Sequence, residues 1–321
     1  MKTGLALIGV AVALAFAWLA REVLLLAFFA VVLSVVFAFP VGWLSRIVPR
    51  GIAVTALVLV LLGSIAATVA FVAPAVGQQV EDVTRTAPRA LRNARDWLRS
   101  KGAKNVEEQA GNAAQKASEI AVPALISVVS GTTGAVLVLV LAVYLVARPQ
   151  SYRDGLRRLV PRDQEPVYDE AYRRTGAALR RWVGGIVVSM AIMGTVTAVG
   201  LRIAGINDWI LLGLLTFFGT FVPYLGAIAS AVPGLLVAIS QSPTHFLSAL
   251  AVYVAVHFVE GHLVQPLVMR RAVEIKPALL LVGQGVAAAI FGIPGVIVAT
   301  PSIVCAQTLV GYFWVERHLG K

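Results

Sequence analysis

Residues Phe217 to Ser240 read FFGTFVPYLGAIASAVPGLLVAIS, and this stretch decides the fold. It is apolar along its whole length, yet Gly219, Pro223, Gly226, Pro233 and Gly234 interrupt it. Proline removes a helical hydrogen bond and glycine loosens the backbone. In hydrocarbon every freed N–H and C=O group needs a partner, so interrupted helices at membrane depth are buried in protein or line a wet cavity. The stretch is therefore interpreted as the centre of a transport pathway.

The composition predicts an all-α polytopic membrane protein. Of the 321 residues, 59% are hydrophobic and only 13% are charged, and a soluble domain cannot hide that much apolar surface. The net charge of +11 fits arginines in cytoplasmic loops and against lipid headgroups better than it fits nucleic-acid binding. The lipid bilayer is therefore an expected partner and nucleic acid is not. The single cysteine, Cys305, excludes an intrachain disulfide and is expected to behave as a small buried hydrophobe.

The lengths of the apolar runs predict about eight membrane elements, two of them interrupted by glycine and proline. Four regions are expected: 1–76 with spans 1 to 3, 77–121 as an extramembrane amphipathic helical segment, 122–182 with span 4 and a basic cytoplasmic connection, and 183–321 as the transport core, with interrupted segments 209–239 and 277–313.

The first two spans are expected to form a short antiparallel hairpin. Leu5 to Leu19 is interpreted as span 1, with a secretory signal as the alternative. Arg21 and Glu22 are predicted to form a tight turn, and Val23 to Phe39 returns as span 2. A basic loop is expected to begin at Pro40.

Two connections carry most of the charge. In the 77–121 segment, apolar residues recur at spacings of three and four, which indicates a helix that either lies on the membrane or a partner subunit, or is a solvated loop. The stretch from Arg148 to Arg181 is the most basic connection and should be cytoplasmic. Within it, Pro166 to Trp182 is predicted to form a helix leading into span 5.

Both interrupted segments are predicted to be helical hairpins, with kinked spans as the alternative. A run from Pro277 to Phe313 is too long for one crossing of about 20 residues and should double back near Gly292 to Gly295. If 209–239 also enters and leaves the membrane on the same side, the basic loop after span 7 lies in the cytoplasm together with the arginine-rich connections. Both chain termini then lie in the cytoplasm. A weak repeat, in which an aromatic residue, proline, glycine and a second proline recur, relates the two segments and points to a transporter site.

Span 7 carries ionisable residues at membrane depth. His257, Glu260 and Gln265 share one helix face, whereas His262 points elsewhere. Because burying a charge is costly, Glu260 is interpreted as the group that holds a proton or a cation. The alternative is that Glu260 pairs with His257 or a backbone N–H and only locks the helices together.

The remaining pathway candidates come from the interrupted segments. Broken helices expose backbone groups, so small side chains suffice to complete a site. The candidates are Pro223, Tyr224, Gly226, Gln284, Gly292, Pro294, Gly295 and Pro301. Asn207 and Asp208 resemble an N-cap for a helix starting at Trp209.

Enzyme chemistry is not expected. The spacing HxxExH at His257, Glu260 and His262 does not place the two histidines one turn apart, so no metal site is predicted. No GxSxG serine motif, Walker A motif or dinucleotide fingerprint occurs, which leaves no signal for a hydrolase, for ATP-driven transport or for a cofactor.

The motifs after Gly219 resemble those of the autoinducer-2 exporter-like transporter family. The family shows a PYxG segment, here at Pro223 to Gly226, and then E-x-x-x-x-Q-P, here from Glu260 to Pro266. A proline–leucine pair at Pro277 and Leu281 and the pattern F-G-x-x-G-x-x-x-A-x-P from Phe291 to Pro301 follow in order. The pair Gly261-His262 departs from the asparagine-rich pair expected beside the glutamate.

This resemblance implies export of small polar metabolites, with a quorum-sensing signal in some members and sodium/proton antiport in others. It also implies a homo-oligomer, with five subunits expected. The sequence is therefore interpreted as a secondary transporter of the cytoplasmic membrane, exporting a small polar molecule at the expense of a proton or sodium gradient. A sodium/proton antiporter and a passive oligomeric channel are the alternatives.

Overall fold

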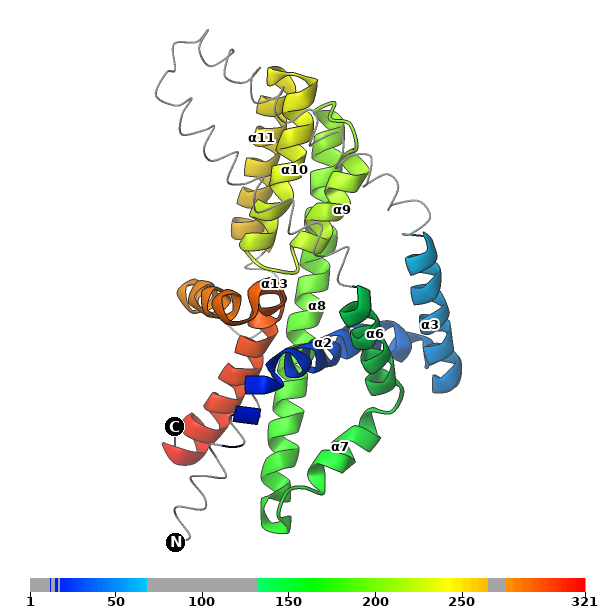
Figure 1. The fold of residues 1–321 in the computed structure, drawn as a ribbon, viewed down its shortest axis with the longest axis vertical. Coiled ribbons are helices and arrows are strands. Elements are labelled where there is room, and N and C mark those ends of the chain that lie inside the picture. Colours follow the sequence, from blue (N-terminus) through cyan, green and yellow to red (C-terminus); the bar gives the residue numbers. More distant parts are fainter. Residues whose placement is uncertain (1–11, 13–14, 17, 68–131, 265–274, 321) are drawn as a thin grey trace. The chain divides into compact units, whose positions relative to one another are not determined.

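The computed structural model describes residues 12, 15–16, 18–67, 132–264 and 275–320, and the regular structure in these ranges is helical throughout (Figure 1). The helices are α2 (Arg21–Leu44), α3 (Arg50–Ala67), α6 (Thr132–Ala147), α7 (Pro149–Arg157), η2 (Arg162–Gln164), α8 (Glu165–Ile203), α9 (Trp209–Gly219), α10 (Leu225–Gln241), α11 (Pro243–Val259), η3 (Glu260–Val264), α13 (Pro277–Val310) and η4 (Gly311–His318). The predicted amphipathic segment 77–121 lies outside the described residues, as does most of span 1.

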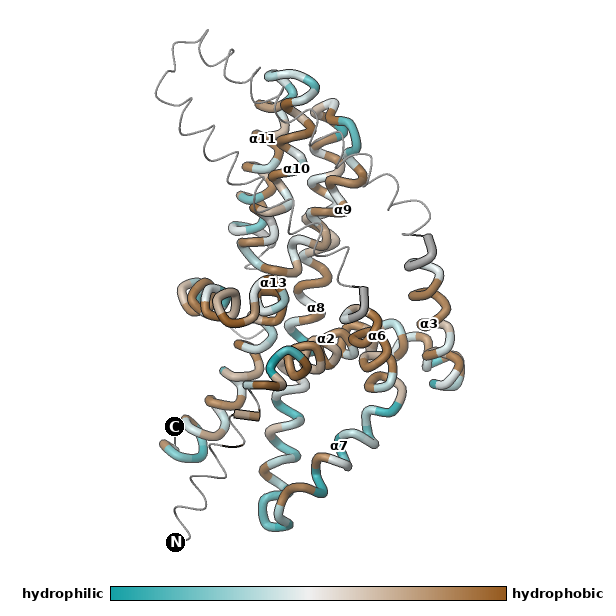
Figure 2. The backbone as a smooth tube through the Cα atoms, in the orientation of Figure 1, coloured by the Kyte–Doolittle hydropathy of each residue, from teal (hydrophilic) through white to brown (hydrophobic). Residues whose placement is uncertain are grey.

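By length and composition alone, four helical stretches could cross a membrane, among them 277–318, or five if the bent pair α6 and α7 counts as one span. Their outward surfaces carry many exposed large hydrophobic side chains, as expected of lipid-facing helices. Figure 2 shows that hydrophilic residues are frequent along α7 and the adjoining half of α8, besides the connections between helices and the C-terminal end. The all-helical membrane fold is thus confirmed, and the larger count of about eight elements remains a prediction.

The predicted turn at Arg21 and Glu22 is wrong. The Ala20 amide donates to the Phe16 carbonyl at 2.8 Å, and the Leu24 amide donates to the Ala20 carbonyl at 2.9 Å, so helical hydrogen bonding continues through this point. The physical reason is that Ala, Arg and Glu favour a helix and neither glycine nor proline occurs here. The predicted loop at Pro40 is also wrong, because α2 runs past this proline to Leu44.

The chain forms two compact units, and each is described by itself. The first unit contains α2, α6, α7, the start of α8, α13 and η4. In it, α6 packs along α2, and the Arg50 guanidinium donates to the Val146 carbonyl at the end of α6 (2.8 Å). The predicted helix leading into span 5 is confirmed, since α8 is unbroken from Glu165 to Ile203.

The second unit contains the end of α8 together with α9, α10, α11 and η3. Its core joins residues from all four α-helices and the loop before α9: Leu201, Ile206, Leu212, Ala238, Ala249 and Tyr253. Close helix contacts depend on small residues. A Cβ added to Gly194 would lie 2.7 Å from Phe217 Cβ, and one added to Gly213 would lie 2.5 Å from Ala198 Cβ. Glycine therefore lets α8 and α9 touch nearly backbone to backbone.

Candidate ion and substrate pathway

Glu260 is the buried carboxylate of the second unit. It ends α11 and begins the π-helical turn η3, and only 6% of its surface is exposed. Its Oε2 lies 3.3 Å from the Nδ1 atom of His257, three residues earlier, while the His257 side chain itself is 40% exposed. The pairing expected from the spacing is therefore present. One partner faces the protein interior and the other reaches outward.

The helix changes its register at this carboxylate. An α-helix interior satisfies its own backbone groups, whereas a π-helical turn widens the helix and is found frequently at functional sites. The change from α11 to η3 at Glu260 therefore places the carboxylate where the helix is least regular. Gln265, predicted to share this face, lies outside the described residues.

His262 takes no part in the pair, as its spacing predicts. Its ring stacks on Phe258 with 4.1 Å between centroids, and its Nδ1 lies 3.1 Å from the Phe258 carbonyl oxygen. Among the residues that the structure describes, no three His, Cys, Asp or Glu side chains are grouped to hold a metal ion.

The first interrupted segment is a helical hairpin, with α9 and α10 as its arms. Leu212 near the start of α9 and Ala238 near the end of α10 share one core cluster. With the Gln241 amide oriented to satisfy its neighbours, it donates to the Gly205 carbonyl (3.3 Å) and accepts from the Asn207 amide (2.9 Å). The open ends of the two arms thus lie together, so this segment doubles back, and its entry and exit on one side of the membrane stay a prediction.

The N-cap expected before α9 is only half right. Asp208 occupies the N-cap position, but it has a left-handed backbone (φ 58°) and its side chain makes no capping hydrogen bond. Sequence preference placed the helix start correctly, but a capping residue normally has an extended backbone, which Asp208 lacks.

The tip of this hairpin is strained at Tyr224. Its backbone has φ 64° and ψ −57°, and the Leu225 amide donates to the Pro223 carbonyl at 2.8 Å across it. This is a classic γ-turn, which is rare and strained for a residue with a side chain. Pro223 is buried at the turn. Strain of this kind is found at functional sites, where the surrounding structure holds it in place.

Gly226 closes the tip. A Cβ on Gly226 would lie 1.6 Å from the Gly219 carbonyl oxygen, and a Cβ on Gly219 would lie 2.7 Å from the Gly226 carbonyl oxygen. Only glycine at both positions lets the two arms approach this closely. The PYxG pattern therefore combines a proline entry, a strained aromatic residue and a backbone contact.

The second interrupted segment, α13, breaks at Gly292, where φ is 65° and ψ is −147°. A Cβ on Gly283 would lie 2.6 Å from Ile303 Cδ1, although 20 positions separate these residues in the chain. A straight helix would place them about 30 Å apart, so the two halves fold back on each other. The predicted doubling back near Gly292 to Gly295 is confirmed.

The other candidates of α13 lie around this fold. Gly295 sits where a Cβ would be 2.3 Å from the Ala287 carbonyl oxygen, while Pro294 is exposed beside the break. Pro301 is buried, and only 1% of the surface of Gln284 is exposed.

The structure therefore gathers the candidates into two groups. One group lies in the second unit, on the α9–α10 tip and at the end of α11, and the other lies along α13 in the first unit.

Sequence reasoning missed Tyr253, a buried residue whose hydroxyl oxygen would be 2.0 Å from a Cβ on Gly234. Its spacing of seven residues from Glu260 on the same helix face was the available signal.

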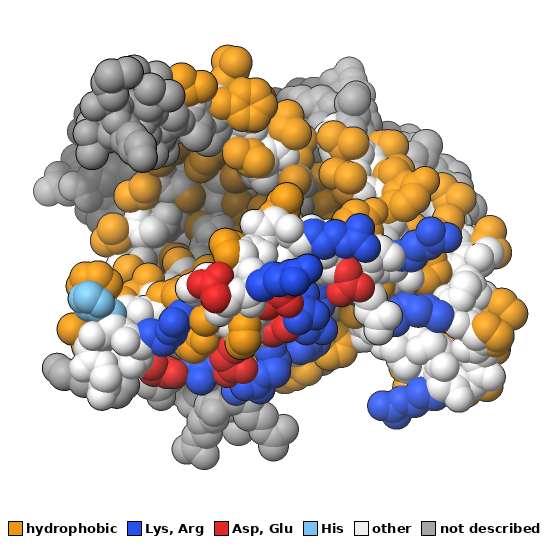
Figure 3. All heavy atoms as spheres, turned by 90° about the horizontal axis from the view of Figure 1, so that it is seen from below, with side chains coloured by type: hydrophobic (Ala, Val, Ile, Leu, Met, Phe, Trp, Pro, Cys, Tyr) orange, Lys and Arg blue, Asp and Glu red, His pale blue; other side chains and the backbone are white. Residues whose placement is uncertain are grey.

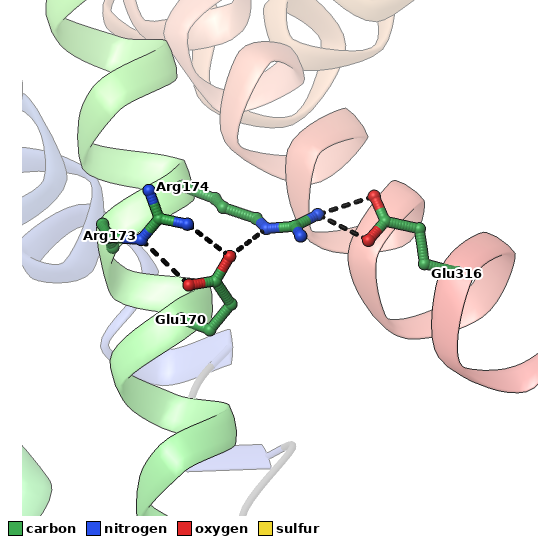
Figure 4. Close-up of polar contacts among 4 residues, drawn as sticks. All are labelled: Glu170, Arg173, Arg174 and Glu316. Atoms are coloured by element: carbon green, nitrogen blue, oxygen red, sulfur yellow. Dashed lines mark hydrogen bonds and ion pairs between the residues drawn. The ribbon is translucent and has the colours of Figure 1, made fainter.

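A polar cluster lies on the charged half of α8. This helix is about 58 Å long, whereas the hydrocarbon core is about 30 Å thick, so its charged first half extends beyond the lipid. There Glu170 accepts hydrogen bonds from Arg173 (2.6 and 2.9 Å) and from Arg174 (2.5 Å), and Arg174 also bonds both oxygens of Glu316 on η4 at 2.6 Å (Figure 4). The hydrogen bonds from Arg173 and Arg174 lower the pKa of Glu170 to about 2.

Comparisons with known proteins agree with this architecture. The profile of the AI-2E family transporters matches residues 7–313. The chain belongs to this family. A candidate transport protein of Mycobacterium tuberculosis is 26% identical over 287 residues, which cover 85% of this chain and 78% of that protein. The candidate transport protein YueF of Bacillus subtilis is 23% identical, with 80% and 75% covered, and the candidate permease PerM of Escherichia coli is 24% identical, with 63% and 58% covered. This AI-2E family member is therefore a multi-pass membrane protein of a transporter family.

Proposed function

We propose that this protein is a secondary active transporter of the cytoplasmic membrane that exports a small polar metabolite or signal molecule, with Glu260 carrying the coupling proton or sodium ion. The observation that supports it is a carboxylate that is 6% exposed within an otherwise apolar helix, 3.3 Å from an outward-reaching histidine. Burying a charge costs several kcal/mol, on the order of 3 kcal/mol even at the centre of a membrane helix. A protein that tolerates this cost in a transporter family uses the charge in transport.

The two hairpins provide the rest of the proposed site. Their breaks at Tyr224 and Gly292 free backbone groups that a regular helix would satisfy internally. Such groups bind ions and polar substrates at half-helix ends, so each hairpin tip is proposed to bind part of the substrate. Transport then follows from alternating exposure of these tips. The protein is further proposed to work as a homo-oligomer, of five subunits by family resemblance, with both termini in the cytoplasm.

The alternative role for Glu260 is structural, as a pair with His257 that locks α11 against its neighbours. The two roles differ in what Glu260→Gln should do. The amide keeps the size of the side chain, but it loses the charge that pairs with His257 and it cannot bind and release a proton. A locking role therefore predicts lower stability with normal flux, whereas a carrier role predicts normal stability without coupled flux.

The test is flux in proteoliposomes containing the purified full-length protein and a trapped pH-sensitive dye. An inward sodium or proton gradient is imposed, and autoinducer-2 loaded inside serves as the export probe. We expect gradient-driven export and an accompanying proton or sodium signal, both reduced at least 100-fold in Glu260→Gln. His262→Gln is the matched control on the same turn and should behave as wild type. Export that ignores both gradients would indicate a channel, and ion exchange without export would indicate a sodium/proton antiporter.

A further inference from the structure

The elbow between α6 and α7 sets the direction of a short basic helix. The axes of the two helices meet at 86°. α6 is apolar, and spanning helices tilt by about 20° on average, so a helix at 86° to a membrane-spanning α6 would lie near the membrane plane rather than across it. Its length and composition fit an interfacial helix.

One face of α7 is already occupied by α8. Arg153 pairs with Asp169 at 2.8 Å, and Arg157 pairs with Glu165 at 2.7 Å. The Tyr168 hydroxyl also donates to the Arg153 carbonyl at 3.2 Å. These contacts fix the rotation of α7 about its own axis and so determine which residues it presents to its surroundings.

The exposed face of α7 and the turn after it carry an apolar row. Tyr152, Leu156 and Leu159 follow each other at spacings of four and three, and they are 44%, 53% and 81% exposed. No described residue covers this row. In water it would be an unfavourable surface, whereas at a bilayer surface it can enter the boundary between headgroups and acyl chains.

Unpaired arginines flank the row. Arg148, Arg158 and Arg162 are exposed, and none of them forms an ion pair with a described residue. Arg50 joins them at the elbow, where its guanidinium donates to the Val146 carbonyl. Figure 3 shows basic side chains gathered on one face, with acidic side chains among them. The exposed Asp154 and Asp163 of the same stretch offset two of these four arginines, and a positive surplus remains. Positive charge beside an apolar row is the complement of an anionic lipid surface.

We propose that α7 and its flanking arginines form a binding surface for anionic phospholipid headgroups, with Arg148, Arg158 and Arg162 at the lipid phosphates and Leu156 and Leu159 in the acyl boundary. A soluble acidic protein would match the arginines, but it would not account for a helix lying perpendicular to a membrane span. The surface lies outside the two hairpins and does not depend on the transport proposal.

The first experiment places a probe on the apolar row. Leu159→Cys is made in the full-length Cys305→Ala protein, labelled with an environment-sensitive fluorophore, and reconstituted into nanodiscs of phosphatidylcholine with or without one-third phosphatidylglycerol. In the anionic discs we expect blue-shifted emission and at least threefold lower quenching by aqueous iodide, with this difference shrinking in 1 M salt because exposed charges are screened. Equal iodide access in the two lipids would overturn the proposal.

The second experiment removes the charges. The triple variant Arg148→Gln/Arg158→Gln/Arg162→Gln should lose the difference between lipids while the probe behaves as before in phosphatidylcholine. Each arginine alone is expected to contribute about a fivefold preference for anionic lipid, as for a cation near such a surface. Arg202→Gln, near the other end of α8, is the control and should change nothing. A persisting lipid difference in the triple variant, or protection that appears only when soluble acidic protein is added, would contradict the assignment.

Discussion

The α9–α10 hairpin and the α13 hairpin look alike in sequence but are built differently. At the α9–α10 tip the unusual backbone belongs to a tyrosine, and the glycines serve to bring two backbones together. In α13 the unusual backbone belongs to Gly292 itself, and a Cβ there would meet open space. In the first hairpin, close packing at Gly226 and backbone strain at Tyr224 therefore restrict which residues the tip can carry. In the second, the break itself needs only the conformational freedom of Gly292, and the close backbone contact lies three residues later, where a Cβ on Gly295 would be 2.3 Å from the Ala287 carbonyl oxygen.

The largest effect is expected from Gly226→Ala. The new methyl group would overlap the Gly219 carbonyl oxygen, and a backbone group cannot rotate away, so we expect a loss of about 3 kcal/mol or more of stability. Thermal unfolding in detergent, followed by size-exclusion chromatography, measures it. Gly261→Ala is the control because no atom lies within 4 Å of its Cβ position. If the two variants were equally stable, the close contact at Gly226 would not be what restricts the first hairpin.

Gly292→Ala should have a smaller effect of a different origin. An alanine at φ 65° and ψ −147° is strained by about 1–3 kcal/mol, although nothing obstructs its methyl group. Gly285→Ala in the same helix is also unobstructed and has no positive φ, so it should be neutral or stabilising by up to about 1 kcal/mol. The thermal unfolding midpoints of the two variants are compared with that of the wild type. An unchanged midpoint for Gly292→Ala would show that the break does not require glycine.

Tyr224→Gly should separate stability from function. Glycine relieves backbone strain worth about 1–3 kcal/mol while losing the contacts of the ring, so we expect stability to change by less than about 1 kcal/mol. Export in proteoliposomes should nevertheless fall at least tenfold because the tip is no longer held in one shape. Tyr224→Phe, which keeps the ring and the strain, is the control. Undiminished export by the glycine variant would contradict a functional role for the strained tip.

The smallest effect is expected from salt. The α13 hairpin leads into η4, where Glu316 pairs with Arg174, whereas the α9–α10 hairpin is closed by the neutral amide of Gln241. In 1 M NaCl hydrogen exchange should quicken slightly in η4 and stay unchanged at the start of α9. Because the pKa of Glu170 is lowered to about 2, its contribution to stability is complete above the unfolded value near 4.5 and is lost as the pH falls through about 2. Protection factors in η4, which remove the intrinsic pH dependence of amide exchange, should therefore not change between pH 7 and pH 5.

Sequence reasoning predicted the parts of the fold that follow from local chemistry. Glycine and proline in apolar runs located both hairpins, and the spacing of His257 and Glu260 placed them together. It failed at Arg21 and Pro40, where charge or proline suggested a turn although the helix continues. Charged residues that favour helices do not end one, and a proline within a long helix is tolerated when neighbours satisfy the freed carbonyl. The strain at Tyr224 needed coordinates because no sequence pattern specifies a positive φ at a tyrosine, whereas Tyr253 could have been found from its spacing to Glu260.

The short arms of the first hairpin have a consequence for the proposed transport pathway if the hairpin enters the bilayer from one side. The α9 arm is about 16 Å long and the α10 arm about 25 Å, both less than the hydrocarbon thickness of about 30 Å. A hairpin that ends part-way through the bilayer leaves a thin barrier, and the electric field is concentrated across it. An ion stepping past the tip would then cross most of the membrane potential at once, at about 2.3 kcal/mol per charge for each 100 mV.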